Sequence, residues 1–254
     1  MTEPPHLFQF RVSHYNEKVR WALDYKGWPH VRHTMVPGFH ILGARLRSGQ
    51  SQLPVLVIGD ETLSNSSHIL AEIERRQPAP PLYPSHASDL ERAREIERFF
   101  DDEVAPDLRR LFWSTYLDHS ADCTRMATDG SSPLARGLFR ALLPVMRPLF
   151  RSNMGVRKEQ IERARSRLGS YFDRLESEIG PSGYLVGDRF GIADLAAAAV
   201  MTAIIRPPQF SYPLPEPWPA ALVELRDNVA DRRGFSWVLD MYARHRGASA
   251  EIVP

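Results

Sequence analysis

The sequence predicts a small α/β domain followed by an all-helical region. Up to about residue 77, short apolar runs and helical patterns follow one another in the order βαβ and then ββα. A proline-rich stretch over 77–84 interrupts this order, because proline cannot continue a helix. Beyond residue 88, apolar residues recur almost throughout at helical spacing. We therefore expect one domain over 1–80, a linker over 81–88 and a helical domain over 89–254.

The first domain combines expected strands and helices. Apolar and polar residues alternate in the strands, and Gly59 and Asp60 provide the turn of a hairpin. Gly27 should end the first helix, since glycine readily adopts the left-handed conformation that follows a helix C-terminus. The expected strands are residues 6–10, 29–35, 53–58 and 62–63. The expected helices are residues 17–26 and 69–73.

The helical region is predicted from apolar residues spaced three and four apart. Pro106 should kink or restart the first long pattern, because it removes a backbone donor. The expected helical segments are residues 89–104, 108–116, 161–179, 192–205 and 220–242.

Composition and charge narrow the function. The 254 residues carry 32 basic and 31 acidic side chains, a formal net charge of +1. So balanced a chain has no overall field to attract nucleic acid or an anionic membrane. The longest uncharged apolar run, residues 195–205, is shorter than the roughly 20 residues that cross a bilayer. Residues 1–5 lack the order of a secretory signal. We expect a cytoplasmic protein with no nucleic-acid or membrane partner.

Cysteine and histidine usage argues against metal and dithiol chemistry. Cys123 is the only cysteine, so no intramolecular disulfide, dithiol centre or paired-cysteine zinc site can form. His30 and His33 share a face of an expected strand, but no acidic residue is spaced to complete a ligand set. We therefore expect a solvated strand face there and no metal. The HExxH, P-loop and GxGxxG motifs are missing, which removes support for zincin, P-loop and dinucleotide-binding classes.

One segment is rich in arginine. Between residues 136 and 167, nine basic side chains stand against two glutamates. A phosphate or nucleic-acid patch is one interpretation, and a solvated helix face is the other. We favour the solvated face, because aromatic residues are not interleaved as a base-stacking platform requires. A weak attraction for an anionic small molecule stays open.

Three segments carry recognisable motifs. Residues 10–27 read FRVSHYNEKVRWALDYKG, residues 53–56 and 63–70 read LPVL and LSNSSHIL, and residues 185–195 read LVGDRFGIADL. In this order and spacing, the segments resemble the soluble glutathione S-transferase family. The resemblance covers most of the chain and is weakest over 124–156, which looks like extra length. It implies a thioredoxin-like N-terminal domain, an all-helical C-terminal domain, a homodimer, and glutathione as co-substrate with no metal or prosthetic group.

Ser13 is the candidate catalytic residue. It lies between an expected strand and an expected helix, where unpaired N–H groups and the helix dipole favour an anion. In serine-type relatives this hydroxyl donates a hydrogen bond to the glutathione sulfur. One charge-assisted bond contributes roughly 1.5–3 kcal/mol, enough to lower a thiol pKa by about one to two units. Helix capping alone is the structural alternative.

The neighbours of Ser13 offer two further candidates. Tyr15 is a rival donor to the sulfur, although its place in the motif is usually filled by a packing residue. His14 could act as a general base, but a solvent-facing loop histidine is the commoner outcome. Because positions 13 and 16 are serine and asparagine, thiol–disulfide exchange by a protein thiol is excluded.

The resemblance also assigns the glutathione contacts. A cis peptide between Leu53 and Pro54 would turn the backbone groups of Leu53 toward the cysteinyl part of glutathione, as an added strand would lie. Ser66, at the start of a helix, would receive the γ-glutamyl carboxylate, unless it serves only as a cap. Asn65 stands where an acid or glutamine is common, so glutathione affinity is expected to be modest.

Two groups complete the list of candidates. Asp194 resembles a buried capping aspartate, with Gly191 in place of its usual hydroxyl partner, and we assign it a structural role. The wall for the second substrate should lie between the Ser13 loop and the first helices of the helical domain. Its candidate residues are Tyr15, Phe99, Glu103, Arg110, Trp113 and Tyr116.

The function predicted from the sequence is that of a glutathione transferase, in which the thiolate attacks an electrophilic small molecule. A glutathione-dependent isomerase or dehalogenase would use the same thiolate. A non-catalytic binding or interaction module with this fold is the alternative from a different class, and His14, Asn16 and Asn65 are the features that favour it.

Overall fold

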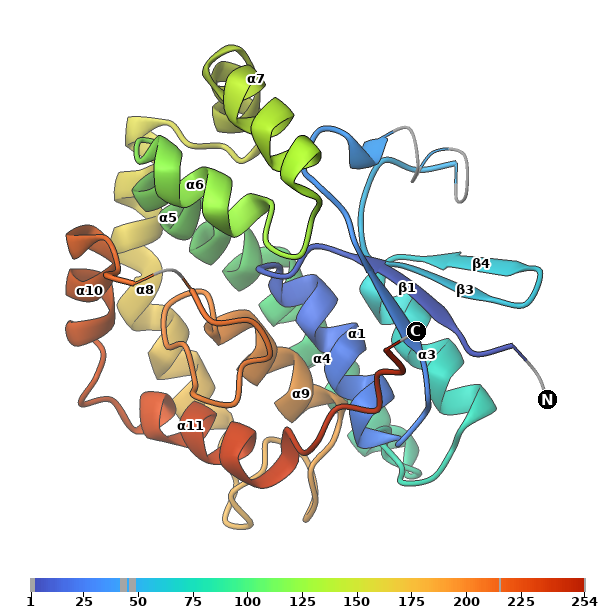
Figure 1. Cartoon of the computed structure of the whole chain (residues 1–254). Coiled ribbons are helices and arrows are strands. Elements are labelled where there is room, and N and C mark those ends of the chain that lie inside the picture. The colour runs from blue at the N-terminus through green and yellow to red at the C-terminus, as the bar shows by residue number, and fades with distance from the viewer. Residues whose placement is uncertain (1–2, 42–44, 46–48, 215, 254) are drawn as a thin grey trace.

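The computed structural model describes residues 3–41, 45, 49–214 and 216–253. Its N-terminal domain contains a four-stranded mixed sheet, and the remainder of the chain is helical (Figure 1). The strands are β1 (His6–Gln9), β2 (Val31–Thr34), β3 (Val55–Ile58) and β4 (Glu61–Ser64). The architecture that the sequence predicts, an α/β thioredoxin-like domain followed by an all-α region, is confirmed.

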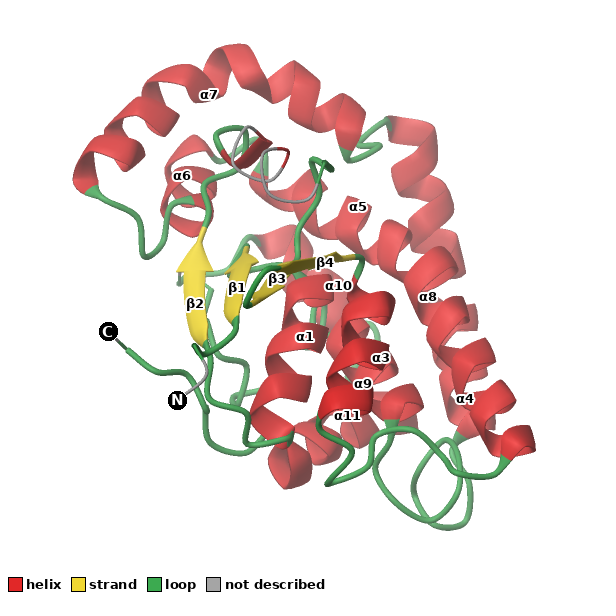
Figure 2. Ribbon diagram, turned by 90° about the vertical axis from the view of Figure 1, so that its right-hand side faces the viewer, coloured by secondary structure: helices red, strands yellow, loops and turns green. Residues whose placement is uncertain are grey.

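The sheet has the strand order β2-β1-β3-β4. The central strand β1 runs parallel to β2 and antiparallel to β3, and β3 and β4 form the expected hairpin. The helices of this domain are α1 (His14–Tyr25) and α3 (Ser66–Arg76), which pack against each other. Both begin directly after a strand and a short loop, so their N-termini lie where the chain leaves the sheet (Figure 2).

The C-terminal region is built from α-helices and one π-helix. In chain order they are α4 (Ala87–Phe99), the π-helix η1 (Phe100–Val104), α5 (Ala105–Tyr116), α6 (Ser120–Ala127), α7 (Pro133–Asn153), α8 (Lys158–Glu178), α9 (Ile192–Met201), α10 (Ala220–Asp227) and α11 (Arg233–His245).

Several helices differ from the expected ones: α6 and α7 are not among the expected segments, and α9 ends at Met201 rather than at residue 205. Two further differences have an identifiable cause. The interruption expected at Pro106 is the π-helix η1, after which Pro106 falls in the first turn of α5, where a missing N–H is harmless. The single helix expected over 220–242 is wrong, because the chain forms α10 and α11 instead. Buried Val229 and Phe235 are six residues apart, a step that does not return to the same helix face.

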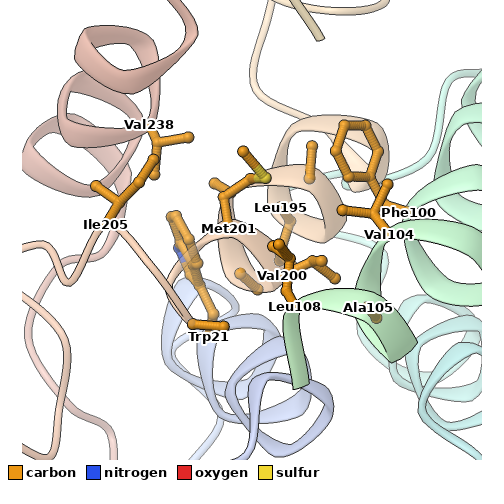
Figure 3. Packing of buried hydrophobic residues seen from close by; sticks show 14 of the residues in the cluster. Trp21, Phe100, Val104, Ala105, Leu108, Leu195, Val200, Met201, Ile205 and Val238 are labelled. Carbon is orange, nitrogen blue, oxygen red and sulfur yellow. The ribbon is translucent and has the colours of Figure 1, made fainter. Parts of the chain in front are cut away.

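The core is centred on α9, all ten residues of which are buried. Its side chains lie between Trp21 of α1 and Phe100 of η1, and α11 closes a third side (Figure 3). Four consecutive alanines, 196–199, let the neighbouring helices approach closely. At the start of α9, buried Asp194 accepts hydrogen bonds from the N–H groups of Leu185 (2.8 Å) and Gly191 (2.9 Å), the structural role expected.

The C-terminal segment is fastened to the N-terminal domain by buried charges. Arg246, 2% exposed, bonds Glu17 Oε1 at 2.7 Å and Asp24 Oδ2 at 2.8 Å. The backbone of Ala250 donates to Asp24 at 2.8 Å, and Ile252 donates to the carbonyl of His30 at 2.8 Å. The end of the chain therefore runs beside the sheet (Figure 1).

This contact overturns one expectation for the histidine pair. His30 is fully buried, and its ring nitrogen Nδ1 lies 2.8 Å from the carbonyl of Trp28, so it is not part of a solvated strand face. His33 is half-buried and stacks on Phe8 with ring centroids 4.7 Å apart. The alternating pattern could not indicate this, because the chain that covers His30 comes from residues 250–252.

Helices α6 and α7 form the outermost layer and have a small core of their own (Figure 2). Phe139 and Leu143 of α7 pack with Val36, Leu117 and Cys123, apart from the main cluster. Another face of α7 exposes five apolar side chains: Leu134, Leu138, Leu142, Val145 and Leu149.

The arginine-rich segment begins in α7. Arg136 and Arg140 are exposed, as the solvated-face interpretation expects. Arg151 instead pairs with Asp118, which lies in the loop between α5 and α6. Among the described residues, no helix combines the length and apolar character needed to cross a bilayer.

Candidate active site

A cavity of about 1170 Å³ separates the sheet edge of the N-terminal domain from the helical region. The N-terminal domain contributes the loop before α1, residues 37–41, the Leu53–Pro54 pair and the start of α3. The helical region contributes side chains from α5 and α7 and from the turn after α9. Two helix N-termini, those of α1 and α3, therefore meet at one cavity, and both favour negative charge.

Ser13 is the N-cap of α1 and lines this cavity. Its backbone is extended (φ −81°, ψ 127°), and its Oγ accepts a hydrogen bond of 3.4 Å from the N–H of Asn16. A serine hydroxyl can accept and donate at the same time. Capping therefore leaves the hydroxyl proton of Ser13 available to an acceptor in the cavity.

Tyr15 also reaches the cavity, but its hydroxyl is engaged. The Tyr15 hydroxyl donates to the backbone carbonyl of Asp101 at 2.8 Å. Burial, together with the Asp101 carboxylate, raises the pKa of Tyr15 to about 12. Its proton is thus directed at the π-helix rather than at the cavity.

His14 is buried, contrary to the expected solvent-facing position. It is 5% exposed, and its ring lies 4.4 Å from that of Tyr15. Burial and the positive charges of Arg109, Lys18 and Arg206 lower the pKa of His14 to about 3, so the imidazole is neutral near pH 7. The motif pattern gave no sign of this, because α5 and the turn after α9 supply two of those charges.

The glutathione residues suggested by the resemblance lie along one wall. The peptide bond between Leu53 and Pro54 is cis, and both residues line the cavity together with Asn65 and Ser66. Ser66 is 6% exposed. The side-chain oxygen of Asn65 caps α3 by accepting from the N–H of Ser67 at 3.0 Å, so this amide has a structural contact of its own.

A buried lysine braces this wall, which sequence reasoning missed. Lys18 is fully buried, and its ammonium bonds Glu97 at 3.0 Å and Asp101 Oδ2 at 2.5 Å. The same Asp101 oxygen accepts from the Ser67 hydroxyl at 3.0 Å, while Asp101 Oδ1 is buried without a partner among the described residues. A lysine within the first helical motif was the available signal.

The expected wall for the second substrate is only partly brought together. Trp113 and Tyr15 line the cavity. Glu103 instead bonds Arg167 at 3.2 Å, and Arg110 donates to the carbonyl of Gly155 at 3.0 Å. Away from the cavity lining, Phe99 packs on Tyr171 and Tyr116 packs on Phe112.

Arg109 and Arg206 line the cavity and were not predicted. Arg109 precedes the expected Arg110 by one residue, which turns its side chain by about 100° around the helix. Arg206 follows the apolar pattern of α9 directly, and that position was its only sequence signal. Among the described residues, no group of three or more His, Cys, Asp and Glu side chains could hold a metal ion.

The chain combines a mixed α/β sheet domain, which has a cis-proline before β3, with an all-helical region. The cavity between them lies at two helix N-termini, and these features define the class of fold. Family models agree: the N-terminal domain model of glutathione S-transferases matches residues 7–81, and the C-terminal domain model matches residues 158–226. Together the two models cover more than half of the chain. The chain belongs to the glutathione S-transferase family.

Solved structures of similar fold cover nearly the whole chain. A glutathione S-transferase of Methylobacterium radiotolerans, in complex with glutathione sulfonate, is 22% identical with a TM-score of 0.57, covering 93% of this chain and 95% of that one. The β-etherase LigF of Sphingobium sp. strain SYK-6 is 16% identical with a TM-score of 0.59, covering 94% and 99%. A bacterial maleylpyruvate isomerase of the zeta class is 18% identical with a TM-score of 0.55, covering 93% and 97%.

At these identities the likeness concerns the fold. A search of curated protein sequences found no match.

Proposed function

We propose that this protein is a glutathione transferase, which conjugates the glutathione thiolate to an electrophilic small molecule. The observation that carries the proposal is that Ser13 lines the same cavity as Leu53, Pro54 and Ser66, and that its hydroxyl donates to no acceptor among the described residues. Family membership and the structures of relatives with bound glutathione derivatives support it.

Glutathione would lie along the wall formed by the N-terminal domain. The backbone of Leu53 would pair with the cysteinyl unit as an added strand does, and Ser66 at the start of α3 would receive the γ-glutamyl carboxylate. Asp101 Oδ1, buried and unpartnered among the described residues, would accept from the glutamyl ammonium. This carboxylate supplies the negative charge that Asn65 does not.

The chemical step would depend on stabilising the thiolate. The hydroxyl of Ser13 would donate to the sulfur, and the N-terminus of α1 would add its positive dipole. The sulfur then forms a bond to the electrophilic carbon, and the leaving group departs with its electron pair. Positioning of the two substrates in one cavity supplies the remaining rate enhancement.

The central test compares Ser13→Ala with the matched hydroxyl deletion Tyr15→Phe. Loss of one charge-assisted hydrogen bond of roughly 1.5–3 kcal/mol should lower turnover about 10- to 100-fold in Ser13→Ala. The pKa of bound glutathione, followed by the ultraviolet absorbance of its thiolate, should rise by about one to two units. Glutathione affinity should change little, and Tyr15→Phe should retain the thiol pKa.

An unchanged thiol pKa in Ser13→Ala would reject Ser13 as the thiolate donor. Binding of glutathione without any turnover of generic electrophiles would instead favour the non-catalytic module, and turnover restricted to isomerisation or dehalogenation would assign the same thiolate to those reactions.

We further propose a cytoplasmic homodimer, in keeping with the family resemblance. Light scattering coupled to size-exclusion chromatography should give a mass near twice 28.9 kDa. A mass of one chain at micromolar concentration would contradict the dimer.

A further inference from the structure

The end of the cavity beside α5 contains an arginine that forms no ion pair with an acidic side chain in the described part of the chain. Arg206 is 8% exposed and lines the cavity. Its Nε and Nη1 are buried without a hydrogen-bond acceptor among the described residues. The guanidinium lies instead over the rings of Phe112 and Phe210, 4.9 Å from each centroid.

The other buried arginines of the chain are paired. Arg20 bonds Glu17 at 2.8 Å, Arg32 bonds Asp24 at 2.6 Å, and Arg246 bonds both of these acids. Burying a guanidinium that has no carboxylate partner carries a large desolvation penalty. The cation–π attraction of the two aromatic rings offsets only part of this penalty. Burial accordingly lowers the pKa of Arg206 to about 10.

The backbone of Arg206 is unusual as well. Its φ of 54° lies in the left-handed region, a backbone conformation that residues other than glycine, asparagine and aspartate seldom adopt. Strained backbone and an unpaired buried charge thus coincide at one residue of the cavity wall. Such coincidences are typical of binding sites, where a ligand supplies the missing interaction.

A second cation lies near the first. Arg109 of α5 lines the cavity, and its Nε is buried without an acceptor among the described residues. The charges of both arginines act on His14, which places them in one neighbourhood next to Ser13. The buried Nε2 of His14 is also without a partner among the described residues, so it can join a polar ligand.

We propose that Arg206 and Arg109 bind a carboxylate of the second substrate, so that the electrophile is an acidic and preferably aromatic small molecule. A guanidinium presents two parallel N–H donors that match the two oxygens of a carboxylate. A bound carboxylate would also supply the negative charge that the described residues do not place beside Arg206. Phe112 and Trp113 on the same stretch of wall provide apolar surface for a ring. This inference rests on the proposed transferase function.

The same anion chemistry has a second source, the glycine carboxylate of glutathione. The groups expected to hold glutathione are the backbone of Leu53 and Ser66 of the N-terminal domain, and Asp101 of η1, which bonds Lys18 and Ser67 of that domain. Arg109 and Arg206 come from the helical region and line the cavity together with Phe112, whose ring lies under the Arg206 guanidinium, so we assign both arginines to the second substrate. The experiment separates the two sources.

The test uses a chloronitrobenzoate and its methyl ester with glutathione. In each reaction the thiolate forms a C–S bond at the chlorinated carbon, and chloride leaves with the electron pair of the C–Cl bond. In the wild type, kcat/KM for the acid should exceed that for the ester by about tenfold or more, after correction for the uncatalysed rates. Arg206→Gln should bring this ratio near one, and Arg206→Lys should retain part of it.

Arg165→Gln, at an exposed arginine of α8, is the matched control and should keep the wild-type ratio. Equal kcat/KM values for acid and ester in the wild type would overturn the proposal. So would an Arg206→Gln protein, folded by circular dichroism, that keeps the preference. A KM for glutathione that rises tenfold in Arg206→Gln, with no effect on the ratio, would assign the site to the glycine carboxylate and reject our assignment.

Calorimetry keeps the anion site testable if no conjugation occurs. The chloronitrobenzoate should bind the glutathione-free wild type at least tenfold more tightly than its ester, and Arg206→Gln should lose this difference. If neither compound is conjugated but the acid binds in this way, the transferase proposal fails and the anion site stands. Equal binding of acid and ester would reject the anion site whatever the turnover.

Discussion

Ser13 and His14 are consecutive residues with different electrostatic surroundings. The Ser13 hydroxyl stays at the cavity with its proton uncommitted, whereas the His14 ring is buried beside three cationic side chains. Because those cations and burial keep the imidazole neutral, the positive field at the cavity comes from arginines, a lysine and helix N-termini.

His14 should therefore make stability depend on acid pH. Its pKa is about 3 in the folded protein and 6.5 in the unfolded chain, so the unfolded chain binds more protons between these values. The free energy of unfolding should fall as pH is lowered from about 6.5 toward 3. In His14→Gln this fall should be shallower. Urea unfolding midpoints at several pH values measure it, and parallel curves for the two proteins would contradict the prediction.

The sequence could indicate those site residues that lie within local motifs. Ser13, Leu53, Pro54 and Ser66 line the cavity because strand ends and helix starts bring them there, and such features are short-range. Arg206 could not be indicated in this way, because its role depends on where the turn after α9 meets α5. Apolar spacing fixes a helix face but not which helix it meets.

At the level of elements, α7 is joined to the rest of the molecule through the small second core. Phe139 and Leu143 of α7 belong to that cluster, whereas α6 contributes Cys123 to the small core and Met126 to the main one, and α7 leaves a row of apolar side chains exposed. Residues 82–157, which contain both helices, also lie outside the two family models. A layer with few buried contacts should open independently of the main core.

Hydrogen exchange should reveal this independence. In Leu143→Ala, which removes a side chain 1% exposed in the small core, amide protection should fall in α6 and α7 while α9 keeps its protection. The matched change Leu108→Ala, in the main core, should lower protection throughout and cost about 2–5 kcal/mol of unfolding free energy. Equal loss of protection in α9 for both variants would show that the molecule opens as one unit.

Element boundaries followed the sequence where apolar spacing was continuous. The β3–β4 hairpin and the start of α9 agree with it because turn residues and long apolar runs are local signals, whereas α9 ends at Met201, four residues before the expected end. The π-helix η1 and the break between α10 and α11 depend on packing against other helices. Apolar residues at helical spacing therefore predict neither of them.

For the whole molecule, Arg246 joins the two ends of the chain. It forms ion pairs with Glu17 and Asp24, whose side chains are fully buried in α1. Arg20, also fully buried, shares Glu17. Loss of one partner from such a buried ion-pair network lowers stability, because the carboxylate that remains keeps its desolvation penalty without the compensating attraction.

Arg246→Met should therefore destabilise the protein by about 3–5 kcal/mol. The matched control Arg244→Met removes an exposed arginine that pairs with Asp240 on the same helix, and should change stability by less than about 1 kcal/mol. Urea unfolding of both variants measures the difference. Similar losses in the two would mean that the buried pairs contribute no more than surface ones.

Residues 246–252 are bonded to α1 and to His30, and this contact limits which domains can be recombined between related transferases. A chimaera that joins this N-terminal domain to the helical region of another transferase would leave Glu17 and Asp24 buried without Arg246, the arginine that they share. Recombination within the expected linker, residues 81–88, should thus be selected against unless residues 246–252 are exchanged together with the N-terminal domain. The N-terminal domain and residues 246–252 should therefore evolve together, although they are encoded at opposite ends of the gene.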